Sequence, residues 1–77
     1  MKLRIASAEK YLLNLGLGVE YISEGTAKEI VVRGTQRSRS EFVRNSISKM
    51  REFGWELADL MNLGSTWRAI FEPASKG

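Results

Sequence analysis

The sequence predicts a small α+β domain, and three patterns support this prediction. Two stretches rich in β-branched and aromatic residues each contain a glycine-led two-residue turn, as β-hairpins do. Between them, apolar residues recur at the spacing of an amphipathic helix. With 77 residues, the chain has room for one hydrophobic core. We therefore expect a single domain, residues 1–77, in which an antiparallel sheet of four strands carries one long helix, about residues 38–53, on one face.

The N-terminal segment predicts two further elements. Residues 2–5 alternate between polar and apolar side chains and predict a short edge strand, which would be the fifth strand of the sheet. Ser7 is then a candidate cap for a short helix over about residues 8–15. Gly16 follows this helix and can adopt the positive φ that commonly ends one. We expect the short helix at an edge of the sheet or on the face opposite the long helix.

The first hairpin is predicted around a turn at residues 25–26, where glycine precedes threonine. A two-residue turn there pairs Tyr21 with Ile30 and Val19 with Val32, which makes one face of the hairpin apolar. The other face is mixed and carries Glu20, Ile22, Glu29 and Val31.

The second hairpin is predicted around a turn at residues 64–65, again with glycine first. This turn sets three apolar-face pairs, which are Asn62 with Trp67, Leu60 with Ala69, and Ala58 with Phe71. Regular alternation then predicts a second mixed face, made of Trp55, Leu57, Asp59, Met61, Arg68, Ile70 and Glu72.

The long helix is predicted to follow a loop that ends near Ser38. Ser38 and Glu41 have the spacing of a capping box, in which each side chain satisfies a free backbone N–H group. Gly54 ends the helix. The apolar stripe of the helix consists of Phe42, Val43, Ile47, Met50 and Phe53.

Composition narrows the chemistry. The chain has no cysteine and no histidine, so it contains no disulfide, no thiolate nucleophile and no histidine acid–base pair. We expect no metal site, no cofactor and no catalytic residues. The N-terminus lacks the apolar run of a signal peptide, and the protein is expected to be cytoplasmic without membrane contact. The net charge of +3 and the pI near 9.6 make this a basic protein and admit a polyanionic partner.

Basic residues gather around the start of the long helix, where free N–H groups and the helix dipole favour an anion. Arginine side chains there suit phosphate recognition, which would make this segment a nucleic-acid or anion site. An ordinary solvated loop with a capped helix explains the same residues. The candidate residues are Arg33, Arg37, Arg39 and Arg44.

Two resemblances extend this interpretation. Residues 54–57 read Gly-Trp-Glu-Leu after the helix, and residues 69–72 read Ala-Ile-Phe-Glu in the last strand. Over residues 28–73 the chain resembles a family of small bacterial and phage domains of unknown function, which implies the helix and terminal hairpin but no specific activity. Residues 38–50 also resemble the second helix of ribbon-helix-helix DNA-binding proteins.

The mixed sheet face is the main candidate interaction surface. Its apolar residues exceed what a solvent-facing sheet usually carries. Trp55 has two interpretations, as an interface anchor or as a partly buried residue that shields the end of the helix. The candidate protein interface consists of Trp55, Leu57, Met61, Arg68, Ile70, Ile22 and Val31.

These features together favour a non-enzymatic protein-interaction module, an accessory or inhibitor protein that occupies the surface of a partner protein. An origin in a phage or mobile element would fit this function. A homodimer through the mixed face or an edge strand is expected. The alternative is a nucleic-acid-binding protein that uses the basic segment at the start of the long helix.

Overall fold

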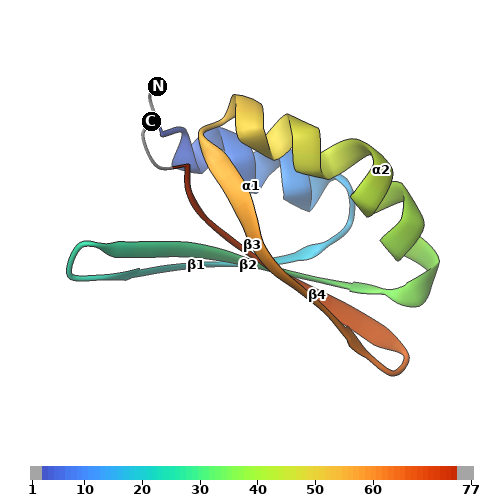
Figure 1. The fold of residues 1–77 in the computed structure, drawn as a ribbon. Helices are drawn as coiled ribbons and strands as arrows, with labels where there is room; N and C mark the ends of the chain where they lie inside the picture. The colour runs from blue at the N-terminus through green and yellow to red at the C-terminus, as the bar shows by residue number, and fades with distance from the viewer. Residues whose placement is uncertain (1–2, 75–77) are drawn as a thin grey trace.

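The computed structural model describes residues 3–74. Its strands form one antiparallel sheet in the order β1-β2-β4-β3, with β1 and β3 at the edges. Both helices lie on the same face of this sheet (Figure 1). The structure confirms the α+β fold with four antiparallel strands. In chain order the elements are α1 (Ile5–Asn14), β1 (Gly18–Glu24), β2 (Ala27–Thr35), α2 (Gln36–Glu52), β3 (Trp55–Leu63) and β4 (Thr66–Pro73).

The predicted fifth strand is not formed by the described residues. Leu3 and Arg4 have no regular structure, Ile5 already begins α1, and Lys2 lies outside the described residues. The prediction of Ser7 as the helix cap is wrong, because the cap position is Arg4. The backbone N–H of Arg4 donates to the carbonyl oxygen of Phe53 at 2.9 Å. This contact ties the start of α1 to the end of α2.

The end of α1 follows the prediction. Gly16 has φ +80°, and its N–H donates to the Leu13 carbonyl at 2.9 Å. The N–H of Leu17 donates to the Leu12 carbonyl at 3.4 Å. This pair of bonds is the Schellman motif, in which the residue after the glycine also makes an apolar contact with a residue in the last turn of the helix. Leu12 and Leu17 are both buried in the core.

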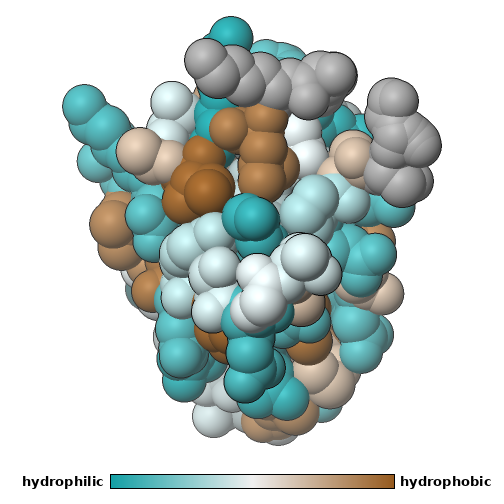
Figure 2. All heavy atoms as spheres, turned by 90° about the vertical axis from the view of Figure 1, so that its left-hand side faces the viewer, coloured by the Kyte–Doolittle hydropathy of each residue, from teal (hydrophilic) through white to brown (hydrophobic). Residues whose placement is uncertain are grey.

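The β1–β2 hairpin has the predicted register. Tyr21 pairs with Ile30, and Val19 pairs with Val32. Gly25 has φ +61° at the turn, a backbone conformation that glycine adopts without steric cost. The turn projects beyond the helix layer (Figure 1). Viewed from this end, pale and hydrophilic residues cover the turn, and apolar residues gather above it toward the helices (Figure 2).

The β3–β4 hairpin has the predicted register only between its turn and Asp59 on β3. Asn62 pairs with Trp67 and Leu60 with Ala69 as expected. A bulge between Leu57 and Asp59 then leaves Ala58 without a partner, and Phe71 pairs with Leu57. The predicted pairing of Ala58 with Phe71 is therefore wrong. An extra residue reverses the in–out alternation of every residue beyond it.

The bulge decides where Trp55 and Leu57 lie. Both turn toward the helices, although regular alternation places them on the opposite face. Trp55 is fully buried, and Leu57 packs against the core. The predicted position of these two residues on the mixed face is wrong for this reason.

Helix α2 begins two residues earlier than predicted. Its cap position is Thr35, which ends β2 by pairing with Thr66. Ser38 is therefore inside the helix, and its Oγ donates to the Thr35 carbonyl at 2.9 Å. The predictions of a capping box and of a loop before the helix are wrong, because β2 is followed directly by α2. Gly54 has φ +91° and ends α2 as predicted.

Most of the predicted stripe on α2 faces the core. Phe42 and Met50 are buried, and Ile47 and Phe53 pack against the core. Val43 differs, with 38% of its surface exposed, while Ser46 is buried. The buried apolar residues are Ala8, Leu12, Leu17, Ile30, Val32, Phe42, Met50, Trp55, Trp67, Ala69 and Phe71.

Helix α1 lies over the edge strand β1, beside α2. The Tyr11 ring lies 6.0 Å from that of Phe53, and the Tyr11 hydroxyl donates to Ser46 Oγ at 3.4 Å. The alternative position of this helix on the second face is therefore wrong. The sheet face opposite the helices, which we call the outer face, is not covered by either helix (Figure 1).

Candidate interaction surfaces

A line of apolar side chains crosses the outer face diagonally. Val31 and Ile70 are direct partners on the two central strands. Ile22 lies on β1 opposite Glu29, and Met61 lies on β3 two residues beyond the partner of Ile70. Diagonal neighbours on one sheet face are within reach of long side chains. We call these four residues, Ile22, Val31, Ile70 and Met61, the outer stripe.

The outer stripe is only partly shielded. Ile22 is 37% exposed, and the other three residues are half-buried. Neighbouring side chains of the sheet supply this shielding, because the helices pack on the other face. A contiguous apolar surface of this kind commonly marks a site of protein–protein contact.

Most charged residues beside the outer stripe separate by sign, while Glu20 and Asp59 lie in one row with Val31 and Ile70 as their direct partners. Toward the β1–β2 turn lie three glutamates, of which Glu56 and Glu72 are direct partners and Glu29 lies one residue beyond the Ile30–Phe71 pair. Toward the other end, Arg33 and Arg68 are direct partners. We call these sets the acidic row, Glu29, Glu56 and Glu72, and the basic row, Arg33 and Arg68.

The two arginines of the basic row differ in their contacts. Arg33 Nη2 lies 3.2 Å from Glu20 Oε1 in an ion pair. Arg68 Nη2 lies 3.9 Å from Met61 Sδ. The Nε atom of Arg68 is screened from solvent and has no hydrogen-bond partner among the described residues. Like charges directly opposite each other on a sheet are destabilising, so an external carboxylate near Arg68 would be favourable.

The predicted interface residues therefore separate into two groups. Ile22, Val31, Met61, Arg68 and Ile70 lie together on the outer face. Leu57 and Trp55 lie on the helix side, as the bulge requires. The Trp55 ring makes an edge contact with Tyr21 at 6.4 Å. Since Trp55 is fully buried, it cannot act as an interface anchor in this fold.

The bulge is visible in the structure as a change in which positions face inward, but the sequence does not show it, because the apolar residue Met61 is odd-numbered and faces outward. The inward apolar positions are odd-numbered at residues 55 and 57 and even-numbered at residue 60. This change of parity requires one extra residue between Leu57 and Leu60. The Asp59 carboxylate then accepts a hydrogen bond from the Leu60 N–H at 2.8 Å, just after the bulge.

The four predicted anion-binding arginines do not form one site. Arg33 lies on the outer face, whereas Arg37 and Arg44 are exposed on α2. Arg39 is half-buried, and its Nε is screened from solvent without a partner among the described residues.

A different basic surface runs along α2. Arg37, Arg44 and Arg51 are exposed and recur every seven residues, which places them on one side of the helix. The ion pairs found within residues 3–74 join Arg33 to Glu20 and Lys49 to Glu52, so these three arginines take no part in them. We call Arg37, Arg44 and Arg51 the helix arginines. Arg51 was missed by sequence analysis, although the seven-residue spacing indicates it.

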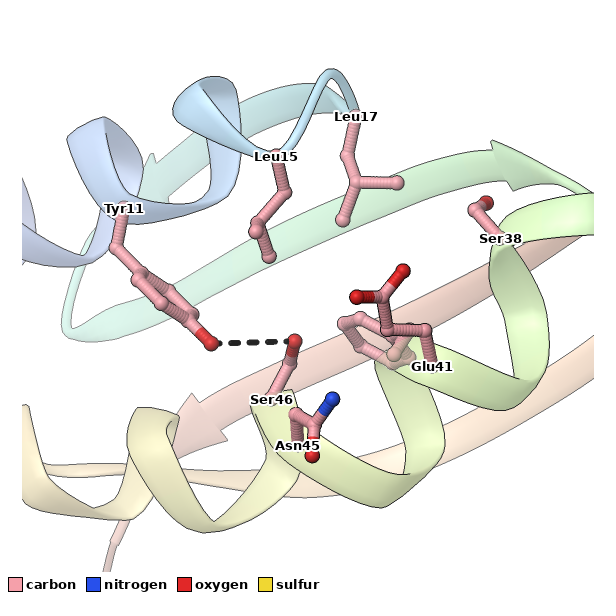
Figure 3. A pocket seen from close by; sticks show the side chains of 8 residues that line it. Tyr11, Leu15, Leu17, Ser38, Glu41, Asn45 and Ser46 are labelled. Atoms are coloured by element: carbon pink, nitrogen blue, oxygen red, sulfur yellow. Dashed lines mark hydrogen bonds between the residues drawn. The ribbon is translucent and has the colours of Figure 1, made fainter.

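Two clefts lie on the helix side. The first, of about 60 Å³, is lined by Tyr11, Leu15 and Leu17 on one side and by α2 residues on the other (Figure 3). Its volume is far below that of usual ligand sites, which begin near ~300 Å³. The Tyr11 hydroxyl that faces this cleft is hydrogen-bonded to Ser46 Oγ. The Glu41 carboxylate also lines the cleft, but the cleft is too small for a usual ligand.

The second cleft, of about 390 Å³, lies between the end of α1 and the ends of β2 and β4. Arg33 is its one ionisable lining residue, and Ser38 Oγ is already hydrogen-bonded to the Thr35 carbonyl. The lining contains hydroxyl groups but no carboxylate, histidine or lysine that could act as the adjacent base in acyl or phosphoryl transfer.

Residues 3–74 contain no cluster of three or more acidic, cysteine or histidine residues placed to hold a metal ion. Neither described helix is long and apolar enough to cross a membrane. Comparison with protein-family models, curated proteins and solved structures found no match to this chain. The fold and its surfaces define a small two-layer α+β domain with one bare sheet face.

Proposed function

We propose that this protein is a non-enzymatic protein-interaction module. It would be an accessory or inhibitor protein that binds the surface of a partner protein through its outer face. One observation supports this function most strongly. Both helices pack on the same side of the sheet, and the other side carries an apolar line between rows of charge. An antiparallel sheet can leave one face in water, and the residues that point to this face are then normally polar, including those on the central strands. Here the central pair is Val31 and Ile70.

A capture experiment with matched variants tests this function. The tagged protein is incubated with nuclease-treated native lysate, beside Met61→Glu on the outer face and Leu13→Glu on α1. Leu13 is 57% exposed, so both variants add the same charge at an exposed or half-exposed apolar site. We expect captured protein to be lost with Met61→Glu and retained with Leu13→Glu. Equal capture by all three baits would contradict the proposal.

The helix arginines support a second candidate function, binding of a nucleic-acid backbone. Their three guanidinium groups are exposed and lie on one side of α2. About three phosphate contacts should give a slope of about −2 to −3 in a plot of log affinity against log salt. Apolar docking on the outer face should show little dependence on salt.

Binding to a labelled oligonucleotide across a salt series separates the two functions. If the second function holds, replacing all three helix arginines with alanine should abolish the affinity and its salt slope. Arg33→Ala is the control, because Arg33 lies on the outer face in an ion pair with Glu20. Oligonucleotide affinity that is unchanged in the triple variant would exclude the helix arginines as its source.

A further inference from the structure

We propose that the outer face binds a second copy of this chain in a symmetric sheet-on-sheet dimer. The two-fold axis lies midway between the two sheets. It is parallel to the planes of the sheets and perpendicular to their strands. This inference rests on the proposed function in one respect, that the outer face is the interaction surface. It adds the identity of one occupant and the orientation in which that occupant binds.

The apolar centre of the outer face suits such a dimer. A rotation about this axis lays each strand over the same strand of the second copy and reverses its direction. The central residues Val31 and Ile70 then meet their own counterparts. Packed sheets keep their strands within about 30° of alignment, so this contact is compatible with the twist of the sheet.

The charged rows select this axis over the alternative. The same rotation places the acidic row of one copy over the basic row of the other. Arg68 then faces Glu72 of the second copy, and Arg33 faces Glu29. An axis parallel to the strands would instead place the two acidic rows against each other. Glu20 and Asp59 flank the central pair and meet an acidic residue of the second copy about either axis, so the acidic and basic rows decide between the axes. Like-charge contacts across an interface are strongly unfavourable, so these rows favour the perpendicular axis.

Arg68 adds an independent observation. It lies directly beside Arg33 in the sheet, and its screened Nε has no hydrogen-bond partner among the described residues. A carboxylate delivered by a second copy would offset the charge of the two adjacent arginines and accept a hydrogen bond from the Nη atoms of Arg68. Hydrogen bonds between a guanidinium and a carboxylate are among the strong ones in proteins.

The size of the surface sets the expected strength. Four strands about 4.8 Å apart, with three rows of outward side chains about 6.8 Å apart, cover on the order of 400 Å² per copy. This is a projected area, and it corresponds to the small end of specific interfaces, which begin at roughly 1,200 Å² of buried accessible surface in total. We therefore expect a reversible dimer that forms in the micromolar range or above.

A charge-swap experiment tests the dimer and its axis together. Sedimentation equilibrium from about 5 µM to about 1 mM is measured for the wild type, Arg68→Glu, Glu72→Arg and the double variant. Each single variant should weaken self-association at least about tenfold, and the double variant should restore it. Mixing the two single variants should also produce a dimer. Lys10→Glu on α1 is the matched control, because Lys10 is exposed on the helix side, and it should associate as the wild type does.

The outcomes separate this inference from the proposed function. A wild-type protein that stays monomeric throughout overturns the dimer, while partner capture that still depends on Met61 leaves the proposed function standing. A dimer that persists in both single variants overturns the inference and indicates another surface, such as the free edge of β1. Failure of both the double variant and the mixture to restore association overturns the proposed axis. The exposed residues Arg33 and Glu29 supply a second swap pair if Arg68→Glu does not fold.

Discussion

The indole ring of Trp67 packs directly over the Cα atom of Gly34. The two residues are partners across β2 and β4, and a Cβ atom at residue 34 would lie 2.6 Å from Cζ2 of the ring and 2.7 Å from Ser38 Oγ. Trp67 Nε1 donates to the Thr35 carbonyl at 2.7 Å and to Ser38 Oγ at 3.2 Å. The absence of a side chain at residue 34 therefore lets one tryptophan join β2, β4 and the first turn of α2.

Gly34→Ala should destabilise the protein by about 1–3 kcal/mol, the usual cost of overpacking a dense core. Gly18→Ala is the control, because a Cβ atom there would meet its nearest neighbour at 3.7 Å, an ordinary contact. Urea unfolding of both variants measures the difference in the free energy of unfolding. Equal effects of the two substitutions would contradict the packing described for Gly34.

Both tryptophans should be inaccessible to aqueous quenchers. Trp55 and Trp67 have no exposed surface, so iodide should quench the fluorescence of the folded protein far less than that of the urea-unfolded protein. Trp55→Phe leaves Trp67 as the single tryptophan, and Trp67→Phe leaves Trp55. Strong quenching of Trp55 in the folded Trp67→Phe variant would show that Trp55 lies on the outer face.

Deletion of Ala58 should leave Trp55 and Leu57 in the core. Ala58 is the unpaired residue of the bulge, since Leu57 pairs with Phe71 and Asp59 with Ile70. Removing it restores regular alternation in the same register, so Leu57 and Trp55 stay on the helix side and the deletion variant should retain cooperative thermal unfolding. Ala58→Ser is the control and should unfold near the wild-type temperature, since Ala58 is exposed. Loss of cooperative unfolding in the deletion variant alone would contradict the position of the extra residue at Ala58.

The sequence predicted the features that are set locally. Alternation on each side of a glycine turn was enough for the register of β1 with β2, and for β3 with β4 near its turn. Four members of the outer face, Ile22, Val31, Met61 and Ile70, followed directly from that register. The glycine ends of both helices were also predicted, because positive φ at these positions depends on the residue itself.

The features that depend on distant contacts were missed. The predicted capping box at Ser38 does not form, because strand pairing at Thr35 and hydrogen bonds of the Gln36 side chain start the helix two residues earlier. That side chain donates to Asn62 Oδ1 at 2.9 Å and to the Thr66 carbonyl at 2.7 Å. The side of the sheet that α1 covers depends on contacts such as Tyr11 with Phe53, which periodicity does not reveal. The arginines were predicted to share one site because a loop was predicted before the long helix. In the structure, β2 places Arg33 on the outer face, and α2 carries Arg37 and Arg44.

The central claim is that the outer face is a docking surface, and methyl NMR tests it most directly. Spectra are recorded as the protein concentration rises from about 20 µM to about 1 mM, and again at the lower concentration with a captured partner protein. We predict that the methyl signals of Val31 and Ile70 shift, while those of Val43 and Leu13 on the helix side stay unchanged. Constant Val31 and Ile70 signals under both conditions would contradict the claim.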